Sequence, residues 1–159
     1  MWRIQWFFVE YLPKVASYAC FLWHDRDWED KDILRLFAFK LRRVREGIAR
    51  YGHHIGKEKT CQEIRLAETL IARIVADEYG RLQWQKHDLK WGSLNHRFGK
   101  QHATSVEFIL EREKAISEAD KKIERTEFRR IFEHEQYMAN QDLAYLFLHL
   151  RKHIKTWWD

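Results

Sequence analysis

The acidic residues ahead of the first long helix are spaced in a way that suggests metal chemistry. Asp25, Asp27 and Glu29 have the alternate spacing of the first three ligands of a calcium-binding loop. Such a loop also needs a glycine at its sixth position and a bidentate glutamate at its twelfth. Asp30 and Leu36 occupy these two positions, so the calcium motif is incomplete.

The same acidic stretch is better explained as the start of a helix. Asp27, Asp30 or Asp32 is expected to cap a helix that begins near Ile33. Negative charge at that end also meets the positive pole of the helix dipole. A divalent-metal site shared with residues elsewhere in the chain is the alternative.

Adjacent histidines, His53 and His54, follow this helix in the string Tyr51-Gly-His-His-Ile-Gly-Lys57. The string resembles the His-Asp-Ile-Gly-Lys motif of HD-type phosphohydrolases, in which adjacent histidine and aspartate bind a divalent metal. His54 stands at the aspartate position, and an imidazole cannot bridge metals as a carboxylate does. We therefore predict a turn between helices, and a metal-dependent hydrolase is only the third functional alternative.

A second histidine pair, His149 and His153, lies four residues apart near the C-terminus. Residues at this spacing share one face of a helix, so the pair is a weak metal candidate. No third ligand is indicated by the sequence. No catalytic residue, metal or cofactor is therefore predicted, and the sequence favours a protein that is not an enzyme.

Residues 80–104 combine positive charge with aromatic rings and contain little helical periodicity. Basic side chains mixed with flat rings are what single-stranded nucleic acid sites use, the charges for phosphates and the rings for bases. We predict a long basic aromatic loop here. Long loops in compact domains tend to be functional or disordered, so this loop is a candidate binding site. The alternative is that the rings pin the loop to the core. The candidate contact residues of this stretch are Arg81, Trp84, Lys86, Lys90, Trp91, Arg97 and Lys100.

Residues 33–79 are predicted to form a helical hairpin around which the rest of the chain is arranged. Its first helix has an apolar stripe at alternating steps of three and four, which is typical of an amphipathic helix. The stripe consists of Leu34, Phe37, Leu41, Val44, Ile48 and Tyr51. The outer face carries the further nucleic-acid candidates Lys40, Arg42, Arg43 and Arg50.

Residues 105–158 are predicted to form two helices that part near Asn140. The first is mostly charged and has a thin apolar seam, which favours pairing with another chain or a solvated edge position. The second has a clean buried stripe. It ends at Trp157 and Trp158, which we expect to close the core.

Residues 1–23 form an aromatic-rich N-terminal segment, predicted to be helical from about Lys14 to Trp23. A membrane span needs about 20 consecutive apolar residues, and Arg3, Glu10 and Lys14 interrupt this run. We expect a packed segment and no membrane span. A surface that docks on a membrane interface or on a partner is the alternative.

Composition places the whole chain in the all-α class. Apolar residues are 45% and charged residues 33% of 159 residues, which is typical of a globular chain rather than a disordered one. Strand signals are almost absent and there is one proline. We predict one domain over residues 1–159, a bundle of about four main helices plus the N-terminal segment. The net charge of +5 permits binding to nucleic acid without requiring it.

Several strings resemble small, uncharacterised helical proteins encoded by bacteriophages and found in viral metagenomes. They are His24-Asp-Arg-Asp-Trp28, Lys40-Leu-Arg-Arg, Glu63-Ile-Arg, Asp77-Glu78-Tyr79 and Lys152-His-Ile-Lys-Thr-Trp-Trp-Asp159. The resemblance covers most of the chain and includes no catalytic motif. It implies a phage origin and a place in the host cytoplasm, or in the virion if the protein is structural.

The functional expectation is a non-enzymatic accessory or structural protein that acts by protein–protein contact or self-association. The thin seam of the charged helix and the aromatic ends of the chain motivate it. Nucleic-acid binding through the basic face of the first helix and the 81–100 loop is the alternative.

Overall fold

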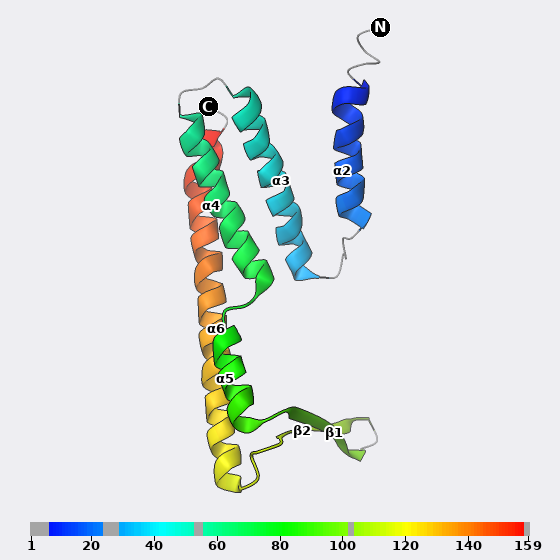
Figure 1. The fold of residues 1–159 in the computed structure, drawn as a ribbon, viewed down its shortest axis with the longest axis vertical. Helices are drawn as coiled ribbons and strands as arrows, with labels where there is room; N and C mark the ends of the chain where they lie inside the picture. The colour runs from blue at the N-terminus through cyan, green and yellow to red at the C-terminus, as the bar shows by residue number, and fades with distance from the viewer. Residues whose placement is uncertain (1–6, 24–28, 53–55, 102–103, 158–159) are drawn as a thin grey trace. The chain divides into compact units, whose positions relative to one another are not determined.

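A computed structural model describes residues 7–23, 29–52, 56–101 and 104–157. The described chain is mostly helical, which confirms the predicted fold class, and it adds one two-stranded hairpin (Figure 1). The helices are η1 (Phe7–Tyr11), α2 (Leu12–Trp23), α3 (Asp30–Tyr51), α4 (Lys57–Ala76), α5 (Arg81–Trp91), α6 (Glu118–His153) and η2 (Ile154–Trp157). The strands are β1 (Leu94–Gln101) and β2 (Val106–Arg112), which pair antiparallel.

Two compact units can be distinguished in this fold. Unit 1 consists of Met1–Val75 and Leu146–Asp159, and unit 2 consists of Ala76–Tyr145. The boundary falls within α6, so this helix contributes residues to both. Different interactions hold each of the two units together.

Unit 1 is built on an apolar core between α3, α4 and the end of α6. The predicted stripe of α3 supplies Leu41, with Leu34, Phe37, Val44 and Ile48 packed against the core, whereas Tyr51 is exposed. The other buried members are Ile64, Ala67, Leu70, Ile71, Leu146, Leu150 and Trp157. Burial of apolar area is the main stabilising term in such a cluster.

Trp157 closes this core, as the sequence predicted. Its side chain is 1% exposed, and its indole Nε1 donates a hydrogen bond to Glu63 Oε2 at 3.2 Å. A buried tryptophan needs such a partner for its single polar group. Trp158 lies outside the described residues.

The N-terminal segment is helical as expected, but none of the residues of α2 is buried. Pro13 stands in the first turn of α2, where its missing N–H costs nothing. Tyr18 and Phe21 contact the Phe39 ring of α3, with ring centroids 5.1 and 4.9 Å apart. α2 therefore packs through one side only.

The prediction of an irregular loop over residues 80–104 is wrong, because this stretch forms α5 and β1. Gly92, at φ +77°, provides the left-handed residue that ends α5. The helix has no apolar stripe of the usual kind, since its inner face carries tryptophans and a histidine. That composition concealed the helix from a search for apolar periodicity.

The C-terminal region also differs from the two helices predicted over residues 105–158. Residues 106–112 form β2, and α6 runs without a break through Asn140. Asparagine is only mildly unfavourable inside a helix. Just beyond it, the buried Asp142 accepts a hydrogen bond from the Tyr79 hydroxyl at 2.8 Å, which fixes that part of the helix to the start of unit 2.

A capping box starts α6. The backbone N–H of Asp120 donates to Ser117 Oγ at 3.0 Å, and the backbone N–H of Ser117 donates to the Asp120 carboxylate at 3.3 Å. This exchange satisfies two backbone donors at the helix start. Thr104 and Glu107 also have the spacing of a capping box in the sequence, but this stretch leads into β2.

Candidate nucleic-acid interface

Hydrogen bonds from aromatic side chains to carboxylates join α5 to α6 within unit 2. The indole Nε1 of Trp84 donates to Glu135 Oε2 at 3.1 Å, and that of Trp91 donates to Glu127 Oε2 at 2.7 Å. Trp91 is buried, and Trp84 packs edge-on against Phe128 with ring centroids 5.0 Å apart. Both tryptophans therefore hold the helix pair together, whereas the alternative interpretation of this stretch expected the rings to pin a loop to the core.

Two further buried polar side chains strengthen unit 2: His87 joins α5 to α6, and Arg112 joins the hairpin to both helices. His87 Nε2 lies 3.1 Å from Glu124 Oε1. Arg112, at the end of β2, donates from Nη1 to Asp88 Oδ1 at 2.7 Å and to the Gly92 carbonyl at 3.0 Å. The base of the hairpin is thus held by charge-assisted hydrogen bonds, which are stronger than neutral ones.

The α6 carboxylates that face α5 are consequently neutralised inside the fold. Glu127 accepts a hydrogen bond from Lys90 Nζ as well as from Trp91. These bonds, first that from Lys90 and then that from Trp91, lower the pKa of Glu127 below its usual range. Glu124 lies against His87 and 3.5 Å from Arg112 Nε. Glu124 and Glu127 therefore face α5 and the hairpin, whereas Glu118 and Glu133 are exposed beside the cations of α6.

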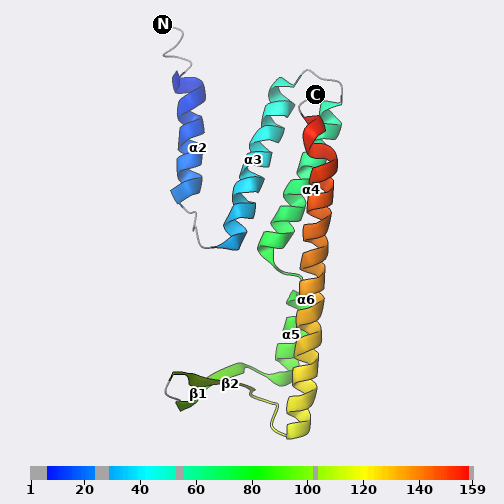
Figure 2. The same ribbon diagram turned by 180° about the vertical axis from the view of Figure 1, so that it is seen from behind.

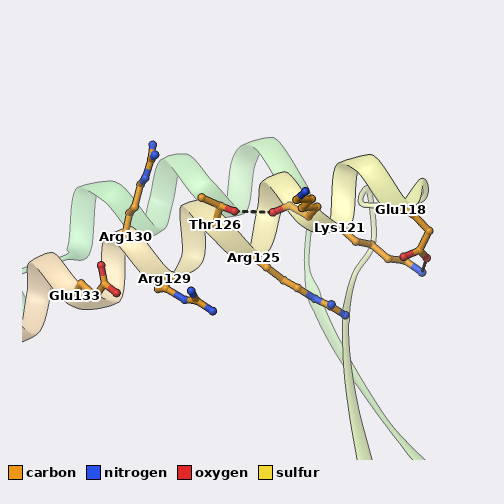
Figure 3. Close-up of a pocket in the computed structure, with 8 residues that line it drawn as sticks. Glu118, Lys121, Arg125, Thr126, Arg129, Arg130 and Glu133 are labelled. Atoms are coloured by element: carbon orange, nitrogen blue, oxygen red, sulfur yellow. Dashed lines mark hydrogen bonds and ion pairs between the residues drawn. The ribbon is translucent and has the colours of Figure 1, made fainter.

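The cations of the same stretch of α6 face outward. Lys121 pairs with Glu118 at 3.0 Å, and this hydrogen bond lowers the pKa of Glu118. Among the described residues, the other four have no ion-pair partner: Lys122, Arg125, Arg129 and Arg130. Figure 3 shows Arg125 and Arg129 reaching to one side of the helix, while Arg130 points to the other. We call these five residues, Lys121, Lys122, Arg125, Arg129 and Arg130, the α6 basic stripe.

The hairpin presents an apolar face beside this stripe. In the register of the two strands His96 lies opposite Leu110 and Phe98 lies opposite Phe108, so these side chains share one face. The Phe98 and Phe108 rings have centroids 5.8 Å apart and are 73% and 55% exposed. Figures 1 and 2 both show the strands extending to one side of α5 and α6.

A hollow of about 390 Å³ lies between the base of the hairpin and α6. Its apolar lining comes from both elements and its rim is basic. Arg125 and Arg129 line this hollow and also belong to the α6 basic stripe. The remaining lining residues are Leu94, Leu110, Arg112, Glu124, Phe128 and Phe132.

The candidate cations of the predicted 81–100 loop are divided between α5 and β1. Arg81 pairs with Glu78 at 3.1 Å, and Arg97 lies 3.5 Å from Glu111. Lys90 is held by Glu127. Lys86 and Lys100 are exposed, so these two retain the most freedom to meet an external anion.

The candidate cations on α3 belong to unit 1, where two of them hold α2. Lys40 Nζ donates to the Tyr18 hydroxyl at 2.7 Å, and this hydrogen bond lowers the pKa of Tyr18. Arg43 Nη1 donates to Ser17 Oγ at 2.7 Å and its guanidinium lies 5.4 Å from the Tyr18 ring centroid. Arg42 is exposed, and Arg50 stands over the ring of the neighbouring Tyr51.

The histidine candidates do not assemble a metal site where the structure describes them. His149 Nε2 lies 2.8 Å from the Glu63 carbonyl oxygen, and His153 Nδ1 lies 3.1 Å from Glu63 Oε1. No group of three metal-ligating side chains occurs among residues 7–23, 29–52, 56–101 and 104–157. His53 and His54 lie outside these ranges.

The α6 basic stripe was not among the sequence candidates. In the sequence of α6, acidic and basic residues are interspersed. Which of them face solvent depends on where α5 packs. A signal was nevertheless present, because Glu124, Glu127 and Glu135 recur at helical spacing apart from the lysines and arginines.

No helix in the described part of the chain is long and apolar enough to cross a membrane, as the sequence predicted. Comparisons with protein-family models, with curated proteins and with solved structures found no match to this chain.

Proposed function

We propose that this protein binds nucleic acid through the α6 basic stripe. The observation that carries the proposal is the sorting of charge on α6. Glu124 and Glu127 form hydrogen bonds and ion pairs with side chains of α5 and the hairpin. In contrast, four cations of α6 have no ion-pair partner among the described residues: Lys122, Arg125, Arg129 and Arg130. A helix of mixed sequence thereby gains a positive outer surface.

The dimensions of the stripe suit a chain of phosphates. From Lys121 to Arg130 the helix rises about 13.5 Å, at 1.5 Å per residue. A single strand of a duplex places a phosphate about every 3.4 Å along the axis, so the stripe spans about four of them. Lysine and arginine that neutralise phosphates release counterions, which drives binding at low salt.

The test is a binding measurement with a matched pair of variants. One variant carries Lys122→Gln, Arg125→Gln, Arg129→Gln and Arg130→Gln. The control carries Lys59→Gln, Arg65→Gln, Arg151→Gln and Lys152→Gln, four exposed cations of unit 1. Both remove the same charge, so they separate a local site from net charge.

Fluorescence anisotropy with labelled 20-nucleotide DNA and RNA at low salt is the readout, and circular dichroism verifies folding. We expect the α6 variant to lose affinity at least about tenfold and the control to lose less than about threefold. Equal losses in the two variants, or no binding by the unmodified protein, would refute the proposal.

Protein–protein contact through η1 and α2 is a second candidate function, favoured by a separate observation. Phe8, Leu12, Val15, Ala19 and Leu22 recur at alternating steps of four and three, and all are exposed. Helices that pair in coiled coils carry this spacing. A contact through this surface would suit the accessory or structural role expected from the sequence.

Self-association is the simplest form of that contact. Sedimentation velocity at rising concentration should reveal a dimer, and Val15→Glu with Leu22→Glu should abolish it. A chain that stays monomeric at high concentration would remove self-association through this stripe.

A further inference from the structure

The apolar face of the hairpin is unusual for so small a sheet. A two-stranded hairpin is marginal by itself and normally buries one face. Here Phe98 and Phe108 stand exposed on the same face, next to the half-exposed Leu110. An exposed apolar face of this kind marks a binding surface.

The charge around this face indicates what it binds. Arg125 and Arg129 belong to the α6 basic stripe and also line the hollow at the foot of the hairpin. Phe128 and Phe132 line the same hollow, and both are partly exposed. Cations and aromatic rings therefore alternate along the hollow, and Leu110 belongs both to its lining and to the apolar face of the hairpin. That arrangement is complementary to a polyanion with flat apolar groups.

We infer that the hollow and the hairpin face receive unpaired bases, so that the protein recognises single-stranded nucleic acid in preference to duplex. This inference rests on the proposed function. The α6 basic stripe holds the phosphates, and the rings of Phe98, Phe108, Phe128 and Phe132 stack against bases that turn inward.

The preference for single strands follows from the accessibility of the base faces. In a duplex each base is stacked between its neighbours and offers no face to a side chain, whereas an unpaired base does. Stacking of a base on an aromatic ring tolerates any base, because all bases have a π-face. We therefore expect strand selectivity with weak sequence preference.

The hollow itself has room and charge for such a ligand. Its volume of about 390 Å³ lies within the range of small-molecule binding sites. Glu124 is the one acidic residue in the lining, and it is engaged by His87 and by Arg112. Repulsion of an anionic ligand by this carboxylate is thereby reduced.

The experiment compares oligothymidylate of 20 nucleotides with a duplex of the same length. The variant Phe98→Leu with Phe108→Leu keeps apolar bulk on the hairpin but removes the flat rings. The control, Trp23→Leu with Tyr51→Leu, removes two exposed aromatic rings from unit 1. Circular dichroism of each variant verifies the fold.

We expect the unmodified protein to bind the single strand at least about tenfold more tightly than the duplex. The Phe98 and Phe108 variant should lose roughly tenfold in affinity for the single strand, in line with the cost of lost stacking. Its affinity for duplex should not change. The unit 1 control should match the unmodified protein with both ligands.

Photo-crosslinking gives a readout that does not depend on a variant. Oligothymidylate carrying 4-thiothymidine should crosslink to peptides that contain Phe98, Phe108, Phe128 or Phe132. Equal affinity for duplex and single strand, or crosslinks confined to unit 1, would overturn the inference.

The failure of this inference is distinguishable from failure of the proposed function. If the α6 variant weakens binding but strand preference and crosslinks are absent, the protein binds phosphates without reading bases. If the α6 variant has no effect, the basic stripe itself is not the site. If the Phe98 and Phe108 variant alters self-association and leaves oligonucleotide binding intact, the hairpin face is a protein contact and the inference is wrong.

Discussion

The two units use their positive charges in opposite ways. In unit 1, Lys40 and Arg43 hold α2, and Arg45 pairs with Glu68 on α4 at 3.1 Å. In unit 2, Glu124, Glu127 and Glu135 of α6 bind partners on α5 and β2, and the cations of the α6 basic stripe remain on the outer surface beside the exposed Glu118 and Glu133. Similar numbers of charged residues therefore produce a helix contact in one unit and a candidate binding surface in the other.

The comparison also extends to what holds each unit together. Unit 1 has a contiguous apolar core, whereas unit 2 depends on hydrogen bonds from indole and imidazole rings to carboxylates. Apolar cores lose stability through cavities, and polar networks lose it through unsatisfied groups and changes in pH. The two units should respond differently to mutation.

The largest effect is expected in the core of unit 1. Trp157→Ala should lower the free energy of unfolding by about 3–5 kcal/mol, because it opens a cavity and leaves Glu63 without the indole donor. Urea unfolding followed by circular dichroism measures it. Trp23→Ala, at a side chain that is 86% exposed, is the control and should change stability by less than about 0.5 kcal/mol. A small loss at Trp157 would show that the apolar core is not what holds unit 1.

A smaller and pH-dependent effect is expected at Glu127 in unit 2. Hydrogen bonds from Lys90 and Trp91 lower the folded-state pKa of this carboxyl, so folding is stabilised when it is ionised. That stabilisation is present above the unfolded pKa and is lost as pH falls through the lower folded pKa. Glu127→Gln should therefore cost about 1 kcal/mol at pH 7 and less in acid.

Urea midpoints at pH 7 and pH 3 provide the comparison. Glu133→Gln is the matched control, since Glu133 lies on the same helix, is exposed and has no ion-pair partner among the described residues. Equal losses for Glu127→Gln at both pH values would mean that its charge does not matter. The polar description of unit 2 would then need revision.

The smallest effect is expected where α2 meets α3. Lys40→Met should raise the pKa of Tyr18 toward its ordinary value, because the hydrogen bond from Lys40 is the main cause of the lowered pKa. Stability should change by about 0.5 kcal/mol or less, as for other exposed polar contacts. An NMR titration of tyrosine ring resonances measures the pKa. An unchanged Tyr18 pKa would show that Lys40 does not hold α2 as described.

The sequence predicts the core of unit 1 well, for a physical reason. Leu41 and Ile64 lie on apolar stripes with helical spacing, and such a stripe has few alternatives to burial. Trp157 could be assigned to the core from its size alone. The caps of α3 were predicted less well, because no side chain makes a capping bond at its start.

The hairpin and the site beside it could not be predicted in the same way. Strands β1 and β2 alternate residues such as His96 and Phe98 with polar neighbours, but the apolar face is exposed, so no burial signal supports the alternation. Arg125 faces outward because Glu124 and Glu127 bind side chains of α5. This orientation depends on tertiary packing. From the sequence, Lys40 and Arg43 belong to an exposed basic face. In the structure both donate hydrogen bonds to side chains of α2.

The salt dependence of oligonucleotide binding tests the central claim most directly. If the five cations of the α6 basic stripe contact phosphates, the logarithm of the affinity for a single strand should fall against the logarithm of salt with a slope of about −3.5. The Lys122, Arg125, Arg129 and Arg130 variant should reduce the slope to about −0.7, the value for one remaining contact. A slope near zero in the unmodified protein, or an unchanged slope in the variant, would contradict the assignment of the stripe as a phosphate-binding surface.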